Sequence, residues 1–279
     1  MLLGANSGNR AASSILRLVA QSIDKRVLAE AEERVLMFHG LNRSIRRALP
    51  TTCIVCGQNA DADHSICHEC GWELPKLGEC CRRCGIELSG TLVTDSCCTS
   101  CQLSPPSFDS CTCAFPYVSP IDKLVADFKF SARFDIGYSL SRALASAFNA
   151  YYNGQAKPEL LVPVPLHKNR LDSRGFNQAS EIGNVLAKYC GVSIAHCALR
   201  RTRNTQPQTS LSSAAARKAN LRKALGVSKS DSLVGVTHIA LIDDVVTTMA
   251  TTQAISRMLR AQQDCRIDVW CLARARRTL

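Results

Sequence analysis

Long apolar stretches are absent from this 279-residue sequence, and no run approaches the roughly 18–20 apolar residues that a membrane helix needs. The sequence therefore predicts that this is not an integral membrane protein. Its start, MLLGANSGNR, lacks a basic segment followed by a long apolar stretch, so we expect no cleaved signal peptide and a cytoplasmic protein. Acidic residues are also scarce. The sequence has 23 Asp and Glu against 34 Lys and Arg, a formal net charge of +11.

Aromatic residues are few, at 5% of the sequence, but hydrophobic residues make up 46% and exclude wholesale disorder. Cysteine is abundant by contrast: 12 of the 16 cysteines lie between Cys53 and Cys113. A secreted disulfide scaffold would spread its cysteines over the whole chain and carry a signal peptide. Clustering in a cytoplasmic protein indicates metal binding instead.

The chain divides into three regions by composition. Residues 1–50 hold eight Lys or Arg and four Asp or Glu, and we interpret them as a helical extension that can be partly disordered. A solvated or packing role is the simpler interpretation of this extension, and contact with a membrane surface or nucleic acid is the alternative. Residues 51–106 form a cysteine-rich module. Residues 111–279 carry the remaining helices and strands.

Strand and helix patterns alternate in the third region. Apolar runs predict strands at residues 160–164, 192–194, 238–242 and 267–272. Periodic apolar positions predict helices through residues 121–128, 140–148, 182–189 and 252–259. This alternation is typical of an α/β fold with a mostly parallel sheet flanked by helices.

Four C-x2-C pairs stand out in the cysteine-rich module. The candidate ligands are Cys53, Cys56, Cys67, Cys70, Cys81, Cys84, Cys98 and Cys101. Each pair can grip one metal ion through a tight turn, and two pairs complete the four-thiolate tetrahedron of structural zinc. A Gly follows three of the pairs and lets the backbone turn its N–H groups toward sulfur. The sequence therefore predicts two structural zinc ions.

Several details of these sites stay open. The pairs could combine in sequential or in crossed order. Cys80 and Cys97 lie beside candidate ligands and could replace them, and His64 or His68 could compete as ligands. Cys111 and Cys113 have a simple interpretation as packing residues at the domain junction.

The segment from Ile239 to Thr251 is the most informative part of the sequence. Four apolar residues build a strand that delivers Asp243 and Asp244 at its carboxyl edge, where open α/β sheets bind ligands. A Thr-rich turn then enters a helix, whose free N–H groups favour a phosphate. Carboxylates beside a phosphate cradle suggest a sugar phosphate, because carboxylates accept hydrogen bonds from ribose hydroxyls. Helix capping is the simpler reading of an isolated Asp pair.

This segment resembles the phosphoribosyl pyrophosphate (PRPP) motif of type I phosphoribosyltransferases. The resemblance implies that fold, with Asp243 and Asp244 on the ribose hydroxyls. It also implies a loop for the 5′-phosphate, formed by Thr247, Thr248, Met249, Ala250 and Thr251. The family usually has Gly at the position of Met249, where the backbone approaches phosphate closely.

With the cysteine pairs included, residues 51–275 resemble the competence protein ComF family. The shared motifs include Phe128-Lys129-Phe130, Val162-Pro163-Val164-Pro165-Leu166, Arg174-Gly175-Phe176-Asn177-Gln178, and the spacing of Arg201, Thr205, Gln208, Leu211, Arg217 and Asn220. The resemblance implies that the loop with His167, Lys168 and Arg170 lies near the diphosphate, whereas an exposed polar loop is the simpler reading. It also implies that residues 200–223 cover the site.

The resemblance implies binding of PRPP with Mg²⁺, or of a related ribose phosphate, and displacement of pyrophosphate at ribose C1 if the protein is an enzyme. It further implies a role in natural transformation, in which the protein handles incoming single-stranded DNA beside the import machinery at the inner membrane. The net charge and the eight Lys or Arg of the acid-free residues 200–230 agree with phosphate contact. Scarce aromatics give less support to base stacking.

Two other functions remain open from the sequence. One is a non-catalytic nucleic-acid- or protein-binding adaptor with a degenerate PRPP site, which Met249 favours. The other is a nucleobase-salvage phosphoribosyltransferase with an added zinc module, which growth of a knockout on a nucleobase would separate from DNA uptake.

Overall fold

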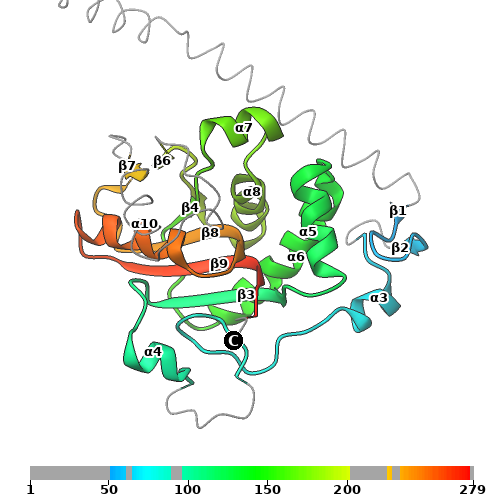
Figure 1. Cartoon of the computed structure of the whole chain (residues 1–279), viewed down its shortest axis with the longest axis horizontal. Coiled ribbons are helices and arrows are strands. Elements are labelled where there is room, and N and C mark those ends of the chain that lie inside the picture. Colours follow the sequence, from blue (N-terminus) through cyan, green and yellow to red (C-terminus); the bar gives the residue numbers. More distant parts are fainter. Residues whose placement is uncertain (1–50, 61–64, 89–95, 202–224, 228–232, 277–279) are drawn as a thin grey trace, which may run out of the picture. The chain divides into compact units, whose positions relative to one another are not determined.

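The computed structural model describes residues 51–60, 65–88, 96–201, 225–227 and 233–276 (Figure 1). Two units are distinguished along the chain, Met1–Thr51 and Thr52–Leu279, and all helices and sheets discussed below except the first short strand lie in the second unit. The helical extension predicted for residues 1–50 lies outside the described residues. The predicted boundaries at residues 51, 106 and 111 remain a prediction. Among the described residues, every helix is too short or too polar to cross a membrane.

A five-stranded sheet forms the centre of the second unit (Figure 1). Its strands are, in spatial order, β3 (Ser110–Pro116), β9 (Arg266–Arg274), β8 (His238–Val246), β4 (Leu160–Pro163) and β5 (Ser193–Ile194). Every pairing in it is parallel. The predicted α/β class is therefore confirmed, with the parallel sheet and flanking helices that the phosphoribosyltransferase resemblance implied and an N-terminal cysteine-rich module.

Helices cover the two faces of the sheet. Those on one face are α5 (Ile121–Phe130), α6 (Phe134–Tyr151) and α8 (Gln178–Cys190). The helix α10 (Ala250–Arg260) packs on the other face. The alternation of strand side chains explains both layers, because Ala240 and Ile242 of β8 join the first core whereas Ile239 and Leu241 join the second. A strand buried on both faces needs the continuous apolar run that the sequence shows.

Strand β8 is longer than the sequence predicted. The apolar run indicated a strand over residues 238–242 with both Asp residues at its edge, but pairing with β9 continues to Val246. The reason is that β9 is equally long and supplies backbone partners along the whole of β8. On the other side β4 stops at Pro163, opposite Ile242. Asp243 and Asp244 thus lie in a part of β8 that has a neighbouring strand on one side only.

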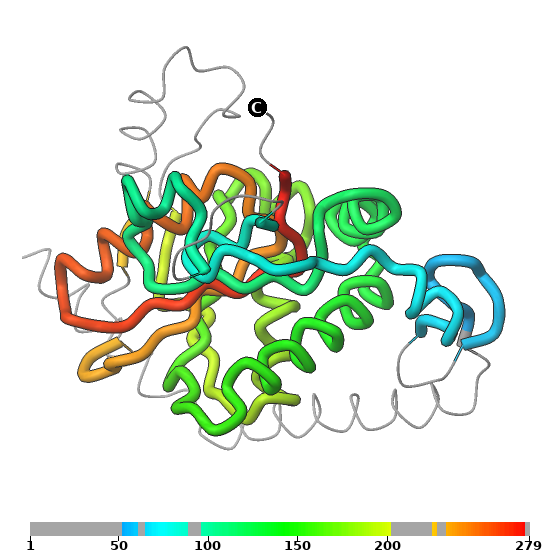
Figure 2. Tube along the Cα trace, turned by 90° about the horizontal axis from the view of Figure 1, so that it is seen from below, coloured from blue at the N-terminus to red at the C-terminus, as the bar shows by residue number. Residues whose placement is uncertain are grey.

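The remaining elements are short. The cysteine-rich module contains β1 (Thr51–Thr52), β2 (Asn59–Ala60), α3 (His68–Glu73) and α4 (Thr99–Leu103). Figure 2 shows the first cysteine region at one end of the tube, joined to the second by an extended segment that follows α3. The helix α7 (Lys168–Arg174) follows β4, and an antiparallel hairpin pairs β6 (Leu199–Arg201) with β7 (Leu225–Val227).

Candidate functional site

The chain leaves β4 and β8 in opposite directions across the sheet. From β4 it passes through α7 and α8 to the edge strand β5, and from β8 it passes through α10 to β9. Loops that diverge from neighbouring parallel strands open a crevice at the carboxyl ends of those strands, where α/β proteins bind ligands. The loop with His167 and the loop with Met249 flank this position, and both were singled out in the sequence.

Asp243 and Asp244 face opposite sides of the sheet because they are consecutive residues of a strand. Lys129 of α5 reaches Asp244, with 3.0 Å between its Nζ and the carboxylate Oδ2. Both side chains are mostly buried, at 18% and 16% exposure, so this ion pair is shielded from solvent screening. Asp243 is held differently: its Oδ1 accepts a hydrogen bond of 2.9 Å from the backbone N–H of Asp244. The two carboxylates therefore have different environments.

Burial and the neighbouring charge of Asp244 raise the pKa of Asp243 to about 7. The N–H of Asp244 and the positive charges of Lys129 and Arg201 oppose this rise. A ligand that supplies hydroxyl donors or a cation stabilises the ionised form of such a carboxyl group and lowers its pKa again. A raised pKa of this kind occurs both at binding sites and at buried structural carboxylates, so it agrees with the predicted role of Asp243 without assigning it.

Arginine residues gather around the Asp pair. Burial and the positive charge of Arg170 lower the pKa of Arg201, while Asp243 opposes the shift. Burial also lowers the pKa of Arg174, while the charge of Asp244 opposes that shift. The site therefore combines two carboxylates with several guanidinium groups, which are the side chains that bind phosphate through two hydrogen bonds at once.

The loop after β8 leads directly into a helix. Thr247 and Thr248 are exposed, and the chain enters α10 at Ala250, where the first turn of a helix presents backbone N–H groups without helical partners. Thr251 lies in that first turn. Met249 immediately precedes the helix with φ +60° and ψ 8°, a left-handed conformation that favours glycine. This is the position at which the resemblance led us to expect Gly.

A buried arginine connects this loop to the cysteine-rich module. The guanidinium of Arg274 donates to the carbonyl oxygens of Val246 and Thr247 at 2.9 and 2.7 Å, and to that of Cys84 at 2.8 Å. Met249 also packs against the cluster that contains Cys84. The backbone of the candidate phosphate loop is thus fixed to the second set of cysteines, a connection that the sequence did not reveal.

The Arg174-Gly175-Phe176-Asn177 motif forms the turn between α7 and α8. Gly175 ends α7 with φ +79°, and Asn177 caps α8 by accepting from the N–H of Ala179 at 3.1 Å. The Asn177 amide also donates to the carbonyl of Val164 at 3.1 Å, which fixes the turn to the end of β4. Phe176 packs on Phe134 of α6 with 4.6 Å between ring centroids.

The residues of the candidate diphosphate loop have separate positions. His167 is buried and caps α7, since its Nδ1 accepts from the N–H of Asn169 at 3.1 Å. Lys168 is exposed and Arg170 half-buried in the first turn of α7. Thr205, Gln208 and Arg217, with most of residues 200–223, lie outside the described residues, so their predicted role over the site stays a prediction.

The eight candidate cysteines form two clusters in sequential order. The clusters are Cys53, Cys56, Cys67 and Cys70, and Cys81, Cys84, Cys98 and Cys101. In each, the sulfur atoms lie within 4.8 Å of one another, and the Cys56–Cys67 and Cys84–Cys98 sulfur pairs are 3.7 Å apart. Zn–S bonds of about 2.3 Å in a tetrahedron place sulfurs about 3.8 Å apart, so both clusters fit one zinc ion each.

The two clusters are built by the same local devices. The first pair of each ends in a glycine with positive φ, Gly57 at +76° and Gly85 at +68°, whereas Gly71 lies inside α3 and needs no such conformation. Backbone N–H groups point at sulfur, as from Val55 to Cys53 at 3.5 Å. Burial opposes ionisation of the Cys53 thiol. Hydrogen bonds from the backbone N–H groups of Cys56, Cys67 and Val55 outweigh this effect and lower the pKa of Cys53 to about 6.

Among the described residues, Cys80, Cys97 and His68 lie outside both four-sulfur groups. The Cys80 thiol donates to the carbonyl of Gly78 at 3.4 Å, and Cys97 is buried beside the second cluster. His68 hydrogen-bonds Trp72, and His64 is outside the described residues. Three further thiols, Cys111, Cys113 and Cys271, meet between β3 and β9 in the core against Gly85, with the last two sulfurs 3.0 Å apart.

Sequence reasoning missed Lys129 as a site residue, although it quoted the motif that contains it. One signal could have identified it: Lys129 directly follows Phe128, a fully buried residue of α5, and so lies next to the buried face of that helix. Nothing in the sequence could have flagged Arg274, the last residue of β9 and one of several arginines near the end of the sequence.

Comparisons with known proteins agree with this architecture. Residues 44–106 match the double zinc ribbon domain family. The chain is 34% identical over 226 residues to competence protein F of Haemophilus influenzae, covering 80% of this chain and 96% of that protein. It is 31% identical over 229 residues to the DNA utilization protein YhgH of Escherichia coli, covering 81% and 98%.

Two further similarities are more distant. Competence protein ComFC of Bacillus subtilis is 28% identical over 204 residues, covering 71% of this chain and 78% of that protein. The match to the solved structure of the allosteric regulatory enzyme of purine biosynthesis covers 53% of this chain and 30% of that enzyme's chain, with 18% sequence identity and a TM-score of 0.33. Because the sequence match to competence protein F and YhgH extends over nearly the whole of both relatives, this chain belongs to the ComF/YhgH family.

Proposed function

We propose that this protein binds PRPP with Mg²⁺, or a related ribose phosphate, at the carboxyl ends of β4 and β8, and that it serves DNA uptake. One observation supports this choice of ligand. Asp243 and Asp244 lie in the part of β8 that has a neighbouring strand on one side only, directly before an exposed Thr-rich turn that enters α10. Ribose hydroxyls and a phosphate are the two groups that such neighbours bind.

The parts of the ligand divide among the residues by charge. The carboxylates of Asp243 and Asp244 accept hydrogen bonds from the ribose hydroxyls. Thr247, Thr248, Ala250 and Thr251 offer hydroxyl and backbone donors to the 5′-phosphate. His167, Lys168 and Arg170 lie after β4 and face the diphosphate, which needs cationic donors. Mg²⁺, when bound with the ligand, neutralises diphosphate charge and so favours departure of pyrophosphate.

The role in DNA uptake comes from the family. The relatives are called competence protein F and DNA utilization protein, and the chain covers nearly the full length of both. The formal net charge of +11 supports contact with the phosphates of single-stranded DNA. Handling of incoming single strands near the import machinery is the form of this role that fits a basic protein with a nucleotide-precursor site.

A non-catalytic adaptor is the second candidate, and Met249 favours it. A glycine at this position would adopt φ +60° freely and leave room for phosphate, whereas Met249 holds the conformation at a steric cost and adds a side chain. Lys129 favours it as well, because its ammonium already neutralises Asp244 without any ligand. As an adaptor, the protein would retain the fold but no longer bind the ribose phosphate.

Calorimetric titration with PRPP and Mg²⁺ tests the proposal. We expect the wild-type protein to bind and the double variant Asp243→Asn/Asp244→Asn to lose binding while its circular dichroism spectrum stays unchanged. Absence of binding by the wild type together with binding by Met249→Gly would show that this chain has lost the ligand and would favour the adaptor. An equal dissociation constant for the wild type and the double variant would show that the Asp pair is structural.

A further inference from the structure

The thiols of Cys111, Cys113 and Cys271 form a third sulfur group, apart from the two four-cysteine clusters. Their sulfur atoms all lie within 4.8 Å of one another. Cys111 and Cys113 are alternate residues of β3, so both side chains lie on one face of the sheet. Cys271 of β9 is the register partner of Cys113 and joins them on that face. The pairing of β3 with β9 thus brings together two cysteines that are 158 positions apart.

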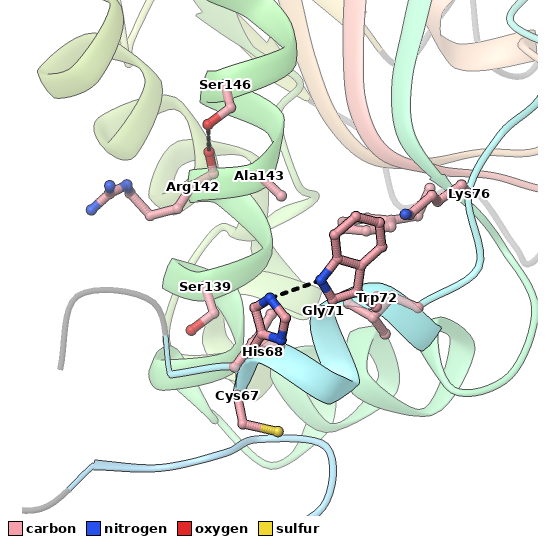
Figure 3. A pocket seen from close by; sticks show the side chains of 12 residues that line it. Cys67, His68, Gly71, Trp72, Lys76, Ser139, Arg142, Ala143 and Ser146 are labelled. Carbon is pink, nitrogen blue, oxygen red and sulfur yellow. Dashed lines mark hydrogen bonds between the residues drawn. The ribbon is translucent and has the colours of Figure 1, made fainter. Parts of the chain in front are cut away.

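The third sulfur group is closed to solvent, unlike the first four-cysteine cluster. Figure 3 shows Cys67 of that cluster among the side chains that line a cavity of about 480 Å³ beside Trp72. In the third group the exposed fraction is 3% for Cys111, 8% for Cys113 and 0% for Cys271. We therefore expect the three sulfurs, without water, to be the whole set of donors at this place.

Packing alone does not account for these three thiols. Buried cysteines often act as small apolar side chains, and Cys190 fits that role because it is buried and, in the described part of the chain, belongs to no group of metal-binding side chains. In the third group the sulfurs of Cys113 and Cys271 are 3.0 Å apart, closer than the about 3.5–4.0 Å of apolar contact. Both thiols also hydrogen-bond Cys111. These sulfurs interact as polar groups that converge on one point.

Gly85 leaves room beside the group. It follows Cys84 of the second four-cysteine cluster, and a Cβ atom at this position would lie 3.3 Å from the sulfurs of Cys111 and Cys113. Because glycine has no Cβ, both sulfurs have space to move when an ion binds. A small rotation about the Cα–Cβ bonds of Cys113 and Cys271 widens their separation for an ion that both sulfurs hold.

Arg274 places a positive charge near the group. Hydrogen bonds from the thiols of Cys113 and Cys271, and then the charge of Arg274, hold the pKa of Cys111 well below its usual range although burial opposes this. The thiolate is the form of cysteine that binds a metal ion. The guanidinium therefore offsets part of the negative charge that thiolates bring into the core.

The number and kind of donors select the ion. Among the described residues no histidine or carboxylate belongs to the group, and Asp243, the register partner of Cys271 on β8, lies outside it. Structural zinc takes four ligands, and iron–sulfur clusters are held by four cysteines. Thiolates also select monovalent copper, which is stable with only two or three sulfur ligands. Three sulfurs closed to water therefore fit Cu(I).

We propose that Cys111, Cys113 and Cys271 bind one Cu(I) ion in a three-coordinate thiolate site between β3 and β9. The proposal is independent of the ribose phosphate site and of DNA. The ion cross-links the edge strand β3 to β9, close to the arginine that holds the loop after β8.

Elemental analysis of the full-length protein, expressed in cells supplied with copper and purified without oxygen, tests the site. We expect two zinc ions and one copper ion per chain in the wild type. Cys113→Ala/Cys271→Ala should keep both zinc ions and lose the copper. Cys190→Ala is the matched control and should keep all three ions. A wild type without copper, or equal copper in the wild type and the double variant, would overturn the proposal.

X-ray absorption at the copper edge needs only the wild-type protein, so it decides the matter even where the double variant folds poorly. We expect Cu(I) with three sulfur neighbours and no nitrogen or oxygen neighbour. Copper with four sulfur neighbours, together with the loss of one zinc ion, would place the copper in a four-cysteine cluster and overturn the third site. Three zinc ions and no copper would overturn the choice of ion.

A disulfide between Cys113 and Cys271 is the competing use of two close thiols. The protein purified without oxygen, stripped of metal and alkylated in denaturant should carry a modification on all 16 cysteines in mass spectrometry. A mass short of two alkyl groups, with a crosslinked peptide that contains Cys113 and Cys271, would overturn the copper site.

Discussion

The ammonium group of Lys129 lies 3.0 Å from the carboxylate of Asp244, so a helix on one face of the sheet supplies the counter-charge for the candidate ribose site. The pair joins two motifs that are far apart in the sequence, Phe128-Lys129-Phe130 and the Asp pair of β8. Its burial gives it more electrostatic weight than an ion pair on the surface has.

Removing this counter-charge should weaken binding of ribose phosphate. In Lys129→Gln the two carboxylates lose their nearest cation, the pKa of Asp243 rises further, and an anionic ligand meets more repulsion. We expect the dissociation constant for PRPP with Mg²⁺ to rise about tenfold, or ~1.4 kcal/mol. Lys129→Arg is the matched control and should keep most of the affinity. Calorimetry showing tighter binding by Lys129→Gln would mean that Lys129 blocks the site instead of serving it.

Asp243 should make the protein less stable as the pH rises. Its pKa is raised by burial to about 7, whereas an unfolded Asp titrates near pH 3.9, so the folded state disfavours the ionised form. This destabilisation is absent below about pH 4, grows between about pH 4 and 7, and is constant above. Asp243→Asn should therefore be more stable than the wild type at pH 8, by on the order of 4 kcal/mol, and the difference should shrink toward pH 5.

Thermal melting at pH 5 and pH 8 measures this difference. Asp244→Asn should give a smaller difference, because it removes a charge that helps to raise the pKa of Asp243 but also leaves Lys129 without its partner. A difference between Asp243→Asn and the wild type that does not change with pH would mean that the Asp243 carboxyl does not titrate in this range.

Met249→Gly should improve binding of ribose phosphate. The substitution relieves a left-handed conformation that costs a non-glycine residue about 1 kcal/mol or more, and it opens the turn to phosphate. The gain in stability is offset by the packing that Met249 makes against the second cysteine cluster. We expect a lower dissociation constant with little change in melting temperature.

Met249→Ala separates the two effects of that substitution. Alanine removes the long side chain but keeps the steric cost of φ +60°. If backbone conformation limits affinity, only the glycine variant binds more tightly in calorimetry. Equal improvement in both variants would instead assign the effect to the side chain.

Loss of one cysteine ligand should release one metal ion. Elemental analysis should give two zinc ions per chain for the wild type and one for either Cys56→Ser or Cys84→Ser. Cys84→Ser should lower the melting temperature more, because its cluster is buried and hydrogen-bonded to Arg274 while Cys56 is exposed. Unchanged zinc content in both variants would contradict the assignment of ligands.

Arg274 should matter to both ends of its hydrogen-bond network. Arg274→Met leaves the carbonyls of Cys84, Val246 and Thr247 without their charged donor, at a cost of about 3 kcal/mol or more. We expect lower stability and weaker PRPP binding with zinc content retained. Arg276→Gln is the matched control, because Arg276 is exposed and its nearest carboxylate, on Glu87, is 3.7 Å away. Wild-type melting and affinity in Arg274→Met would show that the network does not fix the loop.

Features that depend on residues close together in the chain were predictable from the sequence. Two residues between cysteines decide that a pair can grip one ion, and the structure places the four pairs in two clusters. Alternating apolar runs decide strands and helices, and the α/β class followed from their order. The strand, Asp pair and Thr-rich turn are consecutive residues, so the position of the candidate site at the sheet edge was also predictable.

Contacts between residues far apart in the chain became known from the three-dimensional structure. Arg274 and Cys84 are separated by 190 positions, and no periodicity or spacing relates residues so far apart. The sequential order of the cysteine pairs, the ion pair of Lys129 with Asp244 and the cavity beside Trp72 arise in the same way. The local sequence pattern determines which secondary structure a segment can form, whereas burial of a shared hydrophobic core determines which other segments pack against it.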